Sequence, residues 1–217
     1  MSIHQEIRFE SEICADMAKQ GWHYTPPEGS IVSPDAARYD AGYALFPDDV
    51  HDWLMASQPD AWERLEKGYG ERALTEVLGR LRKVLDTEGT LHVLREGIEL
   101  LGLKRPLRLA EFAPASGMNP EILARYHTNR LRVVRQVHYS VSEPAKSLDL
   151  VLFLNGIPVA TAELKSDYTQ SIEDAVYQYK RDRSPRPART DPPEPLLSFP
   201  GGALVHFAVS QSEVLNP

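Results

Sequence analysis

The chain has 217 residues, of which 42% are hydrophobic and 25% are charged, and its formal net charge is -7. These values are those of an ordinary globular protein, long enough for one large domain or two small ones. They exclude a protein that coats nucleic acid with a uniformly basic surface. The single cysteine, Cys14, also excludes a disulfide framework and a zinc site built from several cysteines.

The sequence shows no membrane or secretion signal. Its longest apolar stretch, near 148–154, is far too short to cross a bilayer. The first residues, MSIHQEIRFESE, are charged throughout and lack the apolar region of a signal peptide. We therefore expect a cytoplasmic protein.

Helical patterns occupy the first half of the chain. Apolar residues at helical spacing predict a first helix over 5–20. Residues 33–102 then predict a helical block, in which Pro47 and Pro59 resemble helix starts followed by acids. The clearest helix is ERALTEVLGRLRKVL, and a last one is expected within 88–102. The apolar stripes of this block are typical of a core and indicate no chemistry.

Strand patterns dominate after residue 103. The segments rich in β-branched and aromatic residues are 131–140, 148–154, 157–164 and 203–209. Between the last two, SIEDAVYQYKR predicts a helix whose start, Ser171 to Asp174, resembles a capping box. Three sequential strands predict a meander, and the helix predicts a crossover to the fourth strand. The expected fold class is α/β of the α+β type, a mixed sheet flanked by helices.

Three charges stand at one end of the hairpin LDLVLFLNGIPVATAELKS. Glu163 and Lys165 are two residues apart and would share one face of a strand. A two-residue turn at the Asn-Gly sequence would direct Glu163 away from Asp149. A three-residue loop or a single bulge would instead place Asp149 directly opposite Glu163. A joint site therefore requires the bulge or an equivalent twist.

Such a pair of carboxylates has an evident chemical use. Two buried carboxylates that face each other repel, and a divalent cation relieves the repulsion. Mg²⁺ is commonly held by one or two carboxylates together with substrate phosphates. Lys165 would then face the attacking water or the developing phosphorane charge, which suffices for phosphodiester hydrolysis. The alternative is that Glu163 and Lys165 form a solvated salt bridge of little energetic value.

Asp149, followed on the next strand by Glu163-Leu164-Lys165, resembles the motif of the PD-(D/E)xK restriction-endonuclease-like superfamily. The segments NRLRVVRQVHYS, SLDLVLFLNGIPVATAELKS, DAVYQYKRDR and ALVHFAVSQSEV together resemble the N-terminal nuclease region of the R subunit (HsdR) of type I restriction enzymes. RYDAGYALFPDDVHDWLMASQPDAWERL resembles the helical insertion of one branch of that family. The resemblance covers essentially the whole chain.

The resemblance implies one restriction-endonuclease-like domain over 1–217. The first helix of its core would lie in 1–25, the helical insertion in 33–102, and the core sheet with the catalytic hairpin in 103–217. No G-x-x-x-x-G-K-[ST] phosphate loop occurs in the sequence. The chain thus reads as an N-terminal fragment, and ATP would be used only by motor domains that it lacks.

The resemblance also implies roles for single residues. The implied Mg²⁺ ligands are Asp149, Glu163 and the main-chain carbonyl of Leu164. Lys165 would be the catalytic lysine. An acid of the first helix often completes such sites, and Glu10 is the better match, with Glu12 as the alternative. Either acid could instead be a solvated residue of that helix.

Relatives carry a glutamine and a tyrosine four residues apart on the helix after the motif. Gln178 matches the glutamine and is expected near the DNA or the active site. The position four residues later holds Asp182, and Tyr179 stands next to the glutamine instead. The resemblance therefore implies a catalytic role for Gln178 and leaves a tyrosine role open.

Two basic runs flank the hairpin in the sequence, NRLRVVRQVHYS and YKRDRSPRPAR. The candidates for DNA phosphate contact are Arg130, Arg132, Arg135, Lys180, Arg181 and Arg183. The alternative for each run is a solvated charged face.

The function that follows is Mg²⁺-dependent endonucleolytic cleavage of double-stranded DNA by a type I site-specific deoxyribonuclease. The implied partners are double-stranded DNA, the methyltransferase (M) and specificity (S) subunits, and the helicase-like motor of the R subunit, in a bacterial or archaeal cytoplasm. Two alternatives remain open at this point. One is a non-catalytic docking domain of the R subunit, and the other is a stand-alone PD-(D/E)xK repair or resolvase nuclease.

Overall fold

The structure is a computed structural model that describes residues 3–29, 32–115, 119–165, 172–186 and 192–216. A mixed five-stranded sheet lies at its centre, in the order β1-β2-β3-β4-β5. The strands are β1 (Leu131–His138), β2 (Ser147–Leu154), β3 (Ile157–Leu164), β4 (Val205–Val209) and β5 (Val214–Leu215). The fold class is α+β, as the sequence predicts.

The sheet combines a meander with one crossover. Strands β1, β2 and β3 pair in antiparallel order, whereas β4 pairs parallel to β3. The helix α7 (Ile172–Arg181) lies between β3 and β4 in the chain and provides the crossover. The predicted meander and crossover are therefore confirmed. The short strand β5 pairs antiparallel to β4 and has no counterpart in the sequence prediction.

The remaining helices lie mostly in the first half of the chain. They are α1 (Ile3–Lys19), η1 (Pro34–Arg38), α2 (Pro47–Ser57), α3 (Pro59–Tyr69), η2 (Gly70–Arg72), α4 (Ala73–Glu88), α5 (Thr90–Glu96) and α6 (Pro120–His127). None of the helices in the described ranges is long and apolar enough to cross a membrane. Helix α6 was not predicted from the sequence, because its eight residues carry only a short apolar pattern.

The last helix of the block is shorter than predicted. Helix α5 ends at Glu96 because Gly97 adopts a left-handed φ of 78°. A Cβ on Gly97 would lie 2.1 Å from the carbonyl oxygen of Leu107. The chain then runs extended, and Ile98 forms a β-bridge with Leu107. The prediction of a helix continuing through 88–102 is thus wrong, since a backbone-to-backbone contact replaces its last turn.

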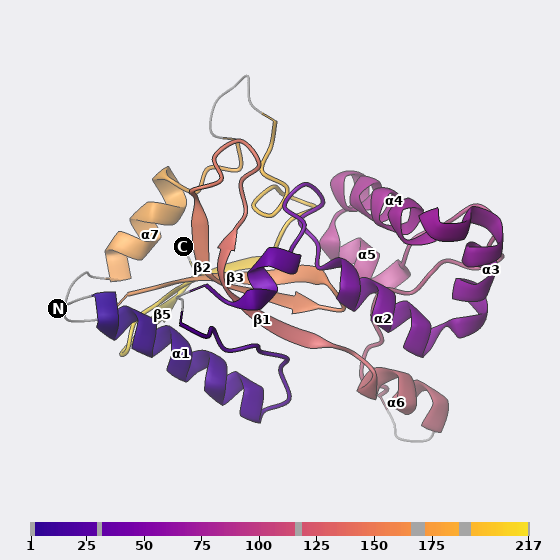
Figure 1. Ribbon diagram of the computed structural model, residues 1–217, viewed down its shortest axis with the longest axis horizontal. Helices are drawn as coiled ribbons and strands as arrows, with labels where there is room; N and C mark the ends of the chain where they lie inside the picture. Colours follow the sequence, from indigo (N-terminus) through magenta and orange to yellow (C-terminus); the bar gives the residue numbers. More distant parts are fainter. Residues whose placement is uncertain (1–2, 30–31, 116–118, 166–171, 187–191, 217) are drawn as a thin grey trace.

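Helices α1 and α7 cover opposite faces of the sheet (Figure 1). Apolar residues of α1 pack in one cluster with Leu150, Ala162 and Leu164. On the other face, the Thr161 hydroxyl lies 2.8 Å from the hydroxyl of Tyr179 on α7. Because successive strand residues alternate between faces and Leu164 packs with α1, Glu163 lies on the α7 face.

The helices α2 to α5 form a block at the turn end of the β2–β3 hairpin, on the right of Figure 1. Their apolar residues form one core that includes Ile157, the first residue of β3. The turn itself is fixed against α2, since a Cβ on Gly156 would lie 2.4 Å from the carbonyl oxygen of Phe46. The charged end of the hairpin therefore points away from the helical block.

Candidate functional site

The hairpin contains the bulge that a joint acidic site requires. Leu154 pairs with Ile157 across a two-residue turn, and a register shift follows at Leu152/Phe153. Beyond the shift, Leu150 pairs with Ala162. One further step along both strands places Asp149 opposite Glu163. The conditional prediction of a bulge is thus confirmed by the register of the sheet.

Asp149 is held by groups from both neighbouring strands. The main-chain N–H of Leu164 donates a hydrogen bond of 2.7 Å to Asp149 Oδ2. The side-chain amide of Gln136 on β1 donates to Asp149 Oδ1 at 3.2 Å. Since each carboxylate oxygen has a fixed donor, the orientation of the Asp149 side chain is set before any ligand binds.

Glu163 is almost fully buried, with 1% of its surface exposed. The guanidinium of Arg183 donates to its Oε1 at 2.8 Å. Burial, followed by the charge of Asp149, raises the pKa of Glu163 to about 8, although Arg183 and Lys165 oppose the rise. The charge of Asp149 thus adds to burial in disfavouring ionisation of Glu163, and a cation between the two ionised carboxylates would offset their repulsion.

Lys165 is the third charge of the hairpin and follows directly on the end of β3. Its residue surface is 8% exposed, and its main-chain N–H donates to Val209 at 2.8 Å. Its side chain lies close enough to Glu163 to lower the pKa of that carboxyl. Within the described residues, its ammonium forms no hydrogen bond or ion pair that would engage it structurally. The lysine is therefore buried beside the acids without being tied to one of them.

Glu10 approaches the same carboxylates from α1. Its Oε1 accepts from the Gln136 amide at 3.0 Å, so one amide group joins Glu10 to Asp149. Its Oε2 accepts two bonds from Arg135, at 2.9 and 2.7 Å. Burial and the charge of Asp149 raise the pKa of Glu10 to about 7. Glu12, the alternative acid, is exposed and pairs with Arg8.

Gln178 lies on α7, five residues before Arg183, which contacts Glu163. Its main-chain carbonyl accepts from the N–H groups of Asp182 and Arg183. Its side-chain oxygen is buried and has no hydrogen-bond partner among the described residues. A buried amide oxygen without a donor is uncommon, which suits a side chain that awaits a ligand. The predicted capping box of this helix involves Ser171, which lies outside the described residues.

Tyr179 does not replace the missing tyrosine of the motif. Its hydroxyl bonds to Thr161, which in turn lies 2.7 Å from Nδ1 of His206. Burial raises the pKa of Tyr179 far above its usual range. Tyr179 is therefore bonded to β3 at Thr161 and not to an acid of the hairpin. Asp182, at the position where relatives carry the tyrosine, is exposed.

The basic run on β1 does not present its charges to solvent. Arg132 pairs with Asp49 at 2.6 Å and with Asp35 at 2.8 Å, and both acids are buried. Arg135 is fully buried against Glu10. The expectation that Arg132 and Arg135 contact DNA phosphates does not fit this placement, because a buried guanidinium already bound to carboxylates cannot reach a phosphate.

The other predicted phosphate contacts differ among themselves. Arg130 is partly exposed but pairs with Asp49 and Asp52. Lys180 and Arg181 are exposed on α7, where Arg181 lies over the ring of Tyr177. Arg183 is turned inward onto Glu163 and belongs to the acidic site itself. Of the six candidates, only the two at the end of α7 therefore form no ion pair with a carboxylate of the described residues.

Sequence reasoning missed Gln136, the residue that joins the two acids. Gln136 stands within the apolar strand β1 and has a left-handed φ of 52°, which is unusual for a residue other than glycine. The only feature of the sequence that could have indicated its role is a polar amide within an otherwise apolar strand. The inward turn of Arg183 left no signal at all, because it depends on where the chain goes after α7.

The donor set suits a magnesium ion of the kind that keeps waters and binds phosphate. Asp149 and Glu163 supply hard carboxylate oxygens across the hairpin, and Glu163 Oε2 accepts no hydrogen bond from a described residue. Among the described residues, no group of three or more acidic, histidine or cysteine side chains is arranged to hold a metal. Two carboxylates completed by main-chain oxygen, water and substrate remain within the usual pattern for Mg²⁺.

Comparisons with known proteins identify a family for most of the chain. The family model described as "Type I restriction enzyme R protein N terminus" matches residues 6–192. No curated protein and no solved structure matches the chain significantly. The family match spans α1, the helical block, the hairpin and α7, and thus includes every element that carries the site. The chain therefore belongs to the family of N-terminal regions of type I restriction enzyme R proteins.

Proposed function

We propose that this chain is the nuclease domain of a type I restriction complex and hydrolyses phosphodiester bonds of double-stranded DNA with Mg²⁺. The observation that carries the proposal is the bulged register, which brings Asp149 opposite the buried Glu163 at one end of the hairpin. A buried carboxylate pair of this kind is relieved by a bound proton or by a cation, and carboxyls with strongly shifted pKa values are typical of functional sites. The family membership supports the same conclusion.

Each residue of the site has a role in the proposal. Asp149, Glu163 and the Leu164 carbonyl would hold the metal, and Glu10 would bind through a water or join them directly. Bound Mg²⁺ would polarise the scissile phosphoryl group and lower the pKa of a bound water. Lys165 would place its ammonium beside the attacking oxygen and offset negative charge as it develops. Gln178 would donate its amide toward the DNA or the attacking water.

Arg183 would also take part in this site. It occupies one oxygen of Glu163, which leaves Oε2 for a metal. Its positive charge lowers the pKa of Glu163 and so favours the ionised form that a metal requires. Arg183 thus acts as a positioning residue for Glu163, in place of the free phosphate contact that its sequence predicts.

The decisive experiment uses the assembled restriction complex with M and S subunits and a full-length R subunit carrying Asp149→Asn. DNA cleavage and ATP hydrolysis are measured against wild type. We expect cleavage to be lost and ATP hydrolysis to be retained, because the acids serve only the cutting step. Cleavage at the wild-type rate would exclude the hairpin as the cutting site and would leave the region as a docking domain.

A second experiment tests metal binding by the 217-residue chain itself. Binding of Mn²⁺, as a paramagnetic substitute for Mg²⁺, is measured by electron paramagnetic resonance at pH above 8. We expect binding by wild type and loss of binding in Asp149→Asn and Glu163→Gln. Glu12→Gln is the matched control, since Glu12 lies on the same helix as Glu10 but faces solvent. Equal binding by all four proteins would contradict the proposed ligand set.

A further inference from the structure

Two cavities on the helical block share a basic wall. The first is about 870 Å³ and the second about 560 Å³, and both are lined by the segment Leu103, Lys104, Arg105 and Pro106. The Lys and Arg side chains that line one or both are Arg64, Arg80, Lys83, Lys104, Arg105, Arg108 and Arg125. The acidic ones are Asp60, Glu76, Glu99 and Glu111. We call these two cavities and their shared wall the basic groove.

The groove stands out against the charge of the whole chain. The chain carries a net charge of -7, whereas cations outnumber acids in the groove. Arg64, Lys104 and Arg105 are exposed and form no ion pair with a described residue. Concentrating unpaired cations in one place costs electrostatic energy, which a bound anion would offset.

Two arginines of the groove, Arg108 and Arg125, form ion pairs with the same buried acid, Glu111. Glu111 is 6% exposed and accepts from Arg108 at 3.1 Å and from Arg125 at 2.9 Å. Each bond uses a single N–H, and the other side-chain donors of both arginines have no partner among the described residues. Both guanidinium groups are therefore held in place with most of their donors available.

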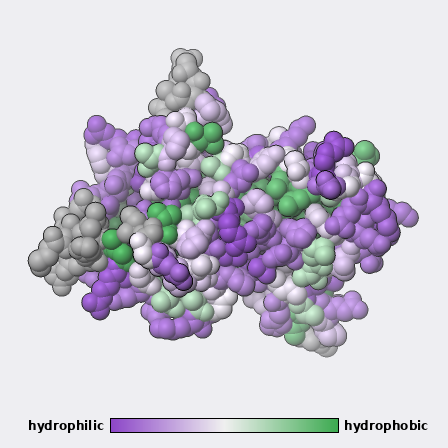
Figure 2. All heavy atoms as spheres, in the orientation of Figure 1, coloured by the Kyte–Doolittle hydropathy of each residue, from purple (hydrophilic) through white to green (hydrophobic). Residues whose placement is uncertain are grey.

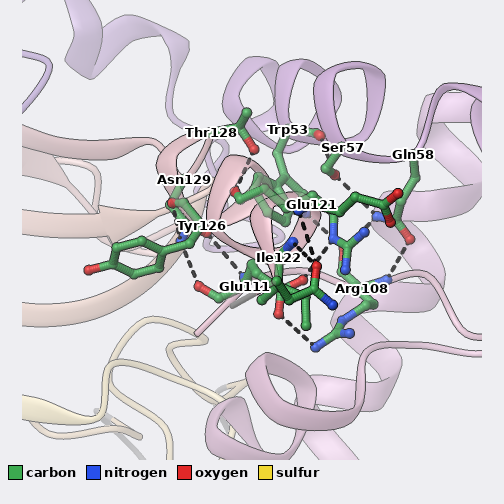
Figure 3. Close-up of polar contacts among 12 residues, drawn as sticks. Trp53, Ser57, Gln58, Arg108, Glu111, Glu121, Ile122, Tyr126, Thr128 and Asn129 are labelled. Carbon is green, nitrogen blue, oxygen red and sulfur yellow. Dashed lines mark hydrogen bonds and ion pairs between the residues drawn. The ribbon is translucent and has the colours of Figure 1, made fainter. Parts of the chain in front are cut away.

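The main chain around this acid is also held in place (Figure 3). The ring N–H of Trp53 and the amide of Gln58 each donate to the carbonyl of Arg108 at 2.8 Å. The Asn129 side chain bonds to the main-chain carbonyl and N–H of Glu111, at 2.7 and 3.2 Å. The floor of the groove is thus rigid, and a ligand would pay little to order it.

The cations of the lining favour nucleic acid as the occupant, although apolar residues such as Trp53, Tyr69 and Leu101 also line these cavities. Protein interfaces are centred on aromatic and apolar anchors and are depleted in lysine. In this groove the cations come from α3, α4, α6 and the segment after α5, so several separate elements contribute positive charge to it. Guanidinium groups also match the geometry of phosphate oxygens. Figure 2 shows one face of the molecule, on which polar residues predominate and hydrophobic residues gather in smaller groups.

The groove is separate from the acids but connected to the same hairpin. The Asn155 amide at the hairpin turn donates to Asn129 at 2.9 Å and thereby joins the floor of the groove. Asp149 lies six residues back along β2, which corresponds to roughly 20 Å of strand. This length equals about six steps of 3.4 Å along a DNA strand.

We propose that the basic groove binds the phosphate backbone of double-stranded DNA, at a distance from the cleavage site. The proposal rests on the proposed function, since DNA is its substrate. It assigns the non-specific DNA contact to the helical block together with the segment after α5 and helix α6, none of which the sequence analysis connects with chemistry. A duplex anchored there would be held along the hairpin toward Asp149 and Glu163.

The test measures binding of the 217-residue chain to a fluorescein-labelled DNA duplex by anisotropy, in EDTA and at a series of salt concentrations. The groove variant is Lys104→Ala/Arg105→Ala, in the shared wall. The control is Arg72→Ala/Arg95→Ala, which removes two exposed charges that line neither cavity. Thermal unfolding of each protein shows that the fold is retained.

We expect the groove variant to bind on the order of tenfold more weakly, and its salt slope to fall by about 2, since each phosphate contact contributes about 0.9. The control should bind as wild type. Equal weakening of both variants would overturn the proposal, because it would indicate a general charge effect. Binding of the groove variant with wild-type affinity would also overturn the proposal, and an acidic protein surface would then be the better candidate for the occupant of the groove.

The two proposals can fail separately. EDTA removes metal from the assay, so groove binding does not depend on the acids. Asp149→Asn should bind the duplex as wild type does while cleavage by the complex is lost. A chain that binds DNA through the groove but never cuts would refute the proposed function alone. If the complex carrying Lys104→Ala/Arg105→Ala still cut DNA and bound it with unchanged affinity, only the proposal that the groove binds DNA would be refuted.

Discussion

The side-chain amide of Gln136 lies 3.2 Å from Asp149 and 3.0 Å from Glu10, so a single NH₂ group bridges two acids from different elements. Its own oxygen accepts from Ser147 at 3.2 Å, which fixes the direction of the amide. The backbone of Gln136 is held at a φ of 52° while it does so. Strain of this kind at a polar cluster is typical of residues that position a site.

The bridge predicts a measurable effect of Gln136→Asn. Asparagine tolerates the left-handed backbone but is one methylene shorter, so the amide would no longer span both acids. Loss of a group that orients metal ligands commonly weakens metal binding roughly 10- to 100-fold. We expect Mn²⁺ affinity to fall in that range, as measured by calorimetry, while the free energy of unfolding changes little.

A metal-independent result accompanies this prediction. The Gln136 amide lowers the pKa of Glu10, so its removal should raise that pKa above about 7 in an NMR titration. Gln20→Asn, at an exposed position after α1, is the control. An unchanged pKa of Glu10 together with unchanged Mn²⁺ affinity would show that the bridge has no part in the site.

The acids also predict how stability depends on pH without metal. The pKa of Glu163 is raised from 4.5 to about 8 in the folded state, so the folded chain binds more protons than the unfolded chain between these values. The free energy of unfolding therefore falls as pH rises through this window. Thermal melting between about pH 5 and about pH 8, within the range set by these two values, should show less of this decline in Glu163→Gln than in wild type.

Added Mg²⁺ should reverse the decline at the upper end of the window. The ion binds the ionised acids, so it stabilises the fold most where both carboxylates have lost their protons. Glu143→Gln, at an exposed acid paired with Lys146, provides a control for a general charge effect. If Glu163→Gln followed the wild-type curve at every pH, the proton on Glu163 would have no bearing on stability.

The sequence was sufficient for the parts of the site that depend on local pattern. The alternation of β2 and β3 and the Asn-Gly turn specified the hairpin, and the need for a bulge followed from the spacing of Asp149 and Glu163. Ion pairs between residues that are far apart in the chain could not be predicted from the sequence. In the sequence, Arg132 and Arg135 resemble the exposed cations of a DNA-binding strand. In the structure they are buried in ion pairs, and the carboxylates of these pairs come from distant segments of the chain. The groove was missed because its cations lie in separate elements.

The buried pairing of Arg132 leads to a prediction about stability. Asp49 is fully buried and receives bonds from Arg132 and Arg130. Asp49→Asn would leave the Arg132 guanidinium without an ionised partner on one side, and breaking a buried pair commonly costs about 3–5 kcal/mol. We expect a loss of that size in urea denaturation. Glu63→Gln, which breaks the exposed pair with Lys67, should leave the midpoint unchanged.

Gly156 gives the last prediction, because the hairpin turn is where the sheet meets the helical block. Its φ is 82°, and a Cβ would lie 2.4 Å from the carbonyl oxygen of Phe46 and 2.9 Å from the main-chain nitrogen of Val50. Both contacts are backbone atoms, so they cannot move aside without shifting α2. Gly156→Ala should therefore destabilise the chain by more than the usual 1–3 kcal/mol of a strained position.

Gly68→Ala is the matched control for this change. Gly68 lies in α3, where an added Cβ would meet no atom within 4 Å, and alanine favours a helix over glycine by about 1 kcal/mol. That variant should gain stability in urea denaturation, whereas Gly156→Ala loses it. Because the turn fixes the register that places Asp149 opposite Glu163, Gly156→Ala should also weaken Mn²⁺ binding, although the turn lies at the other end of the hairpin. Wild-type Mn²⁺ affinity in a destabilised Gly156→Ala chain would show that the bulge alone sets the register.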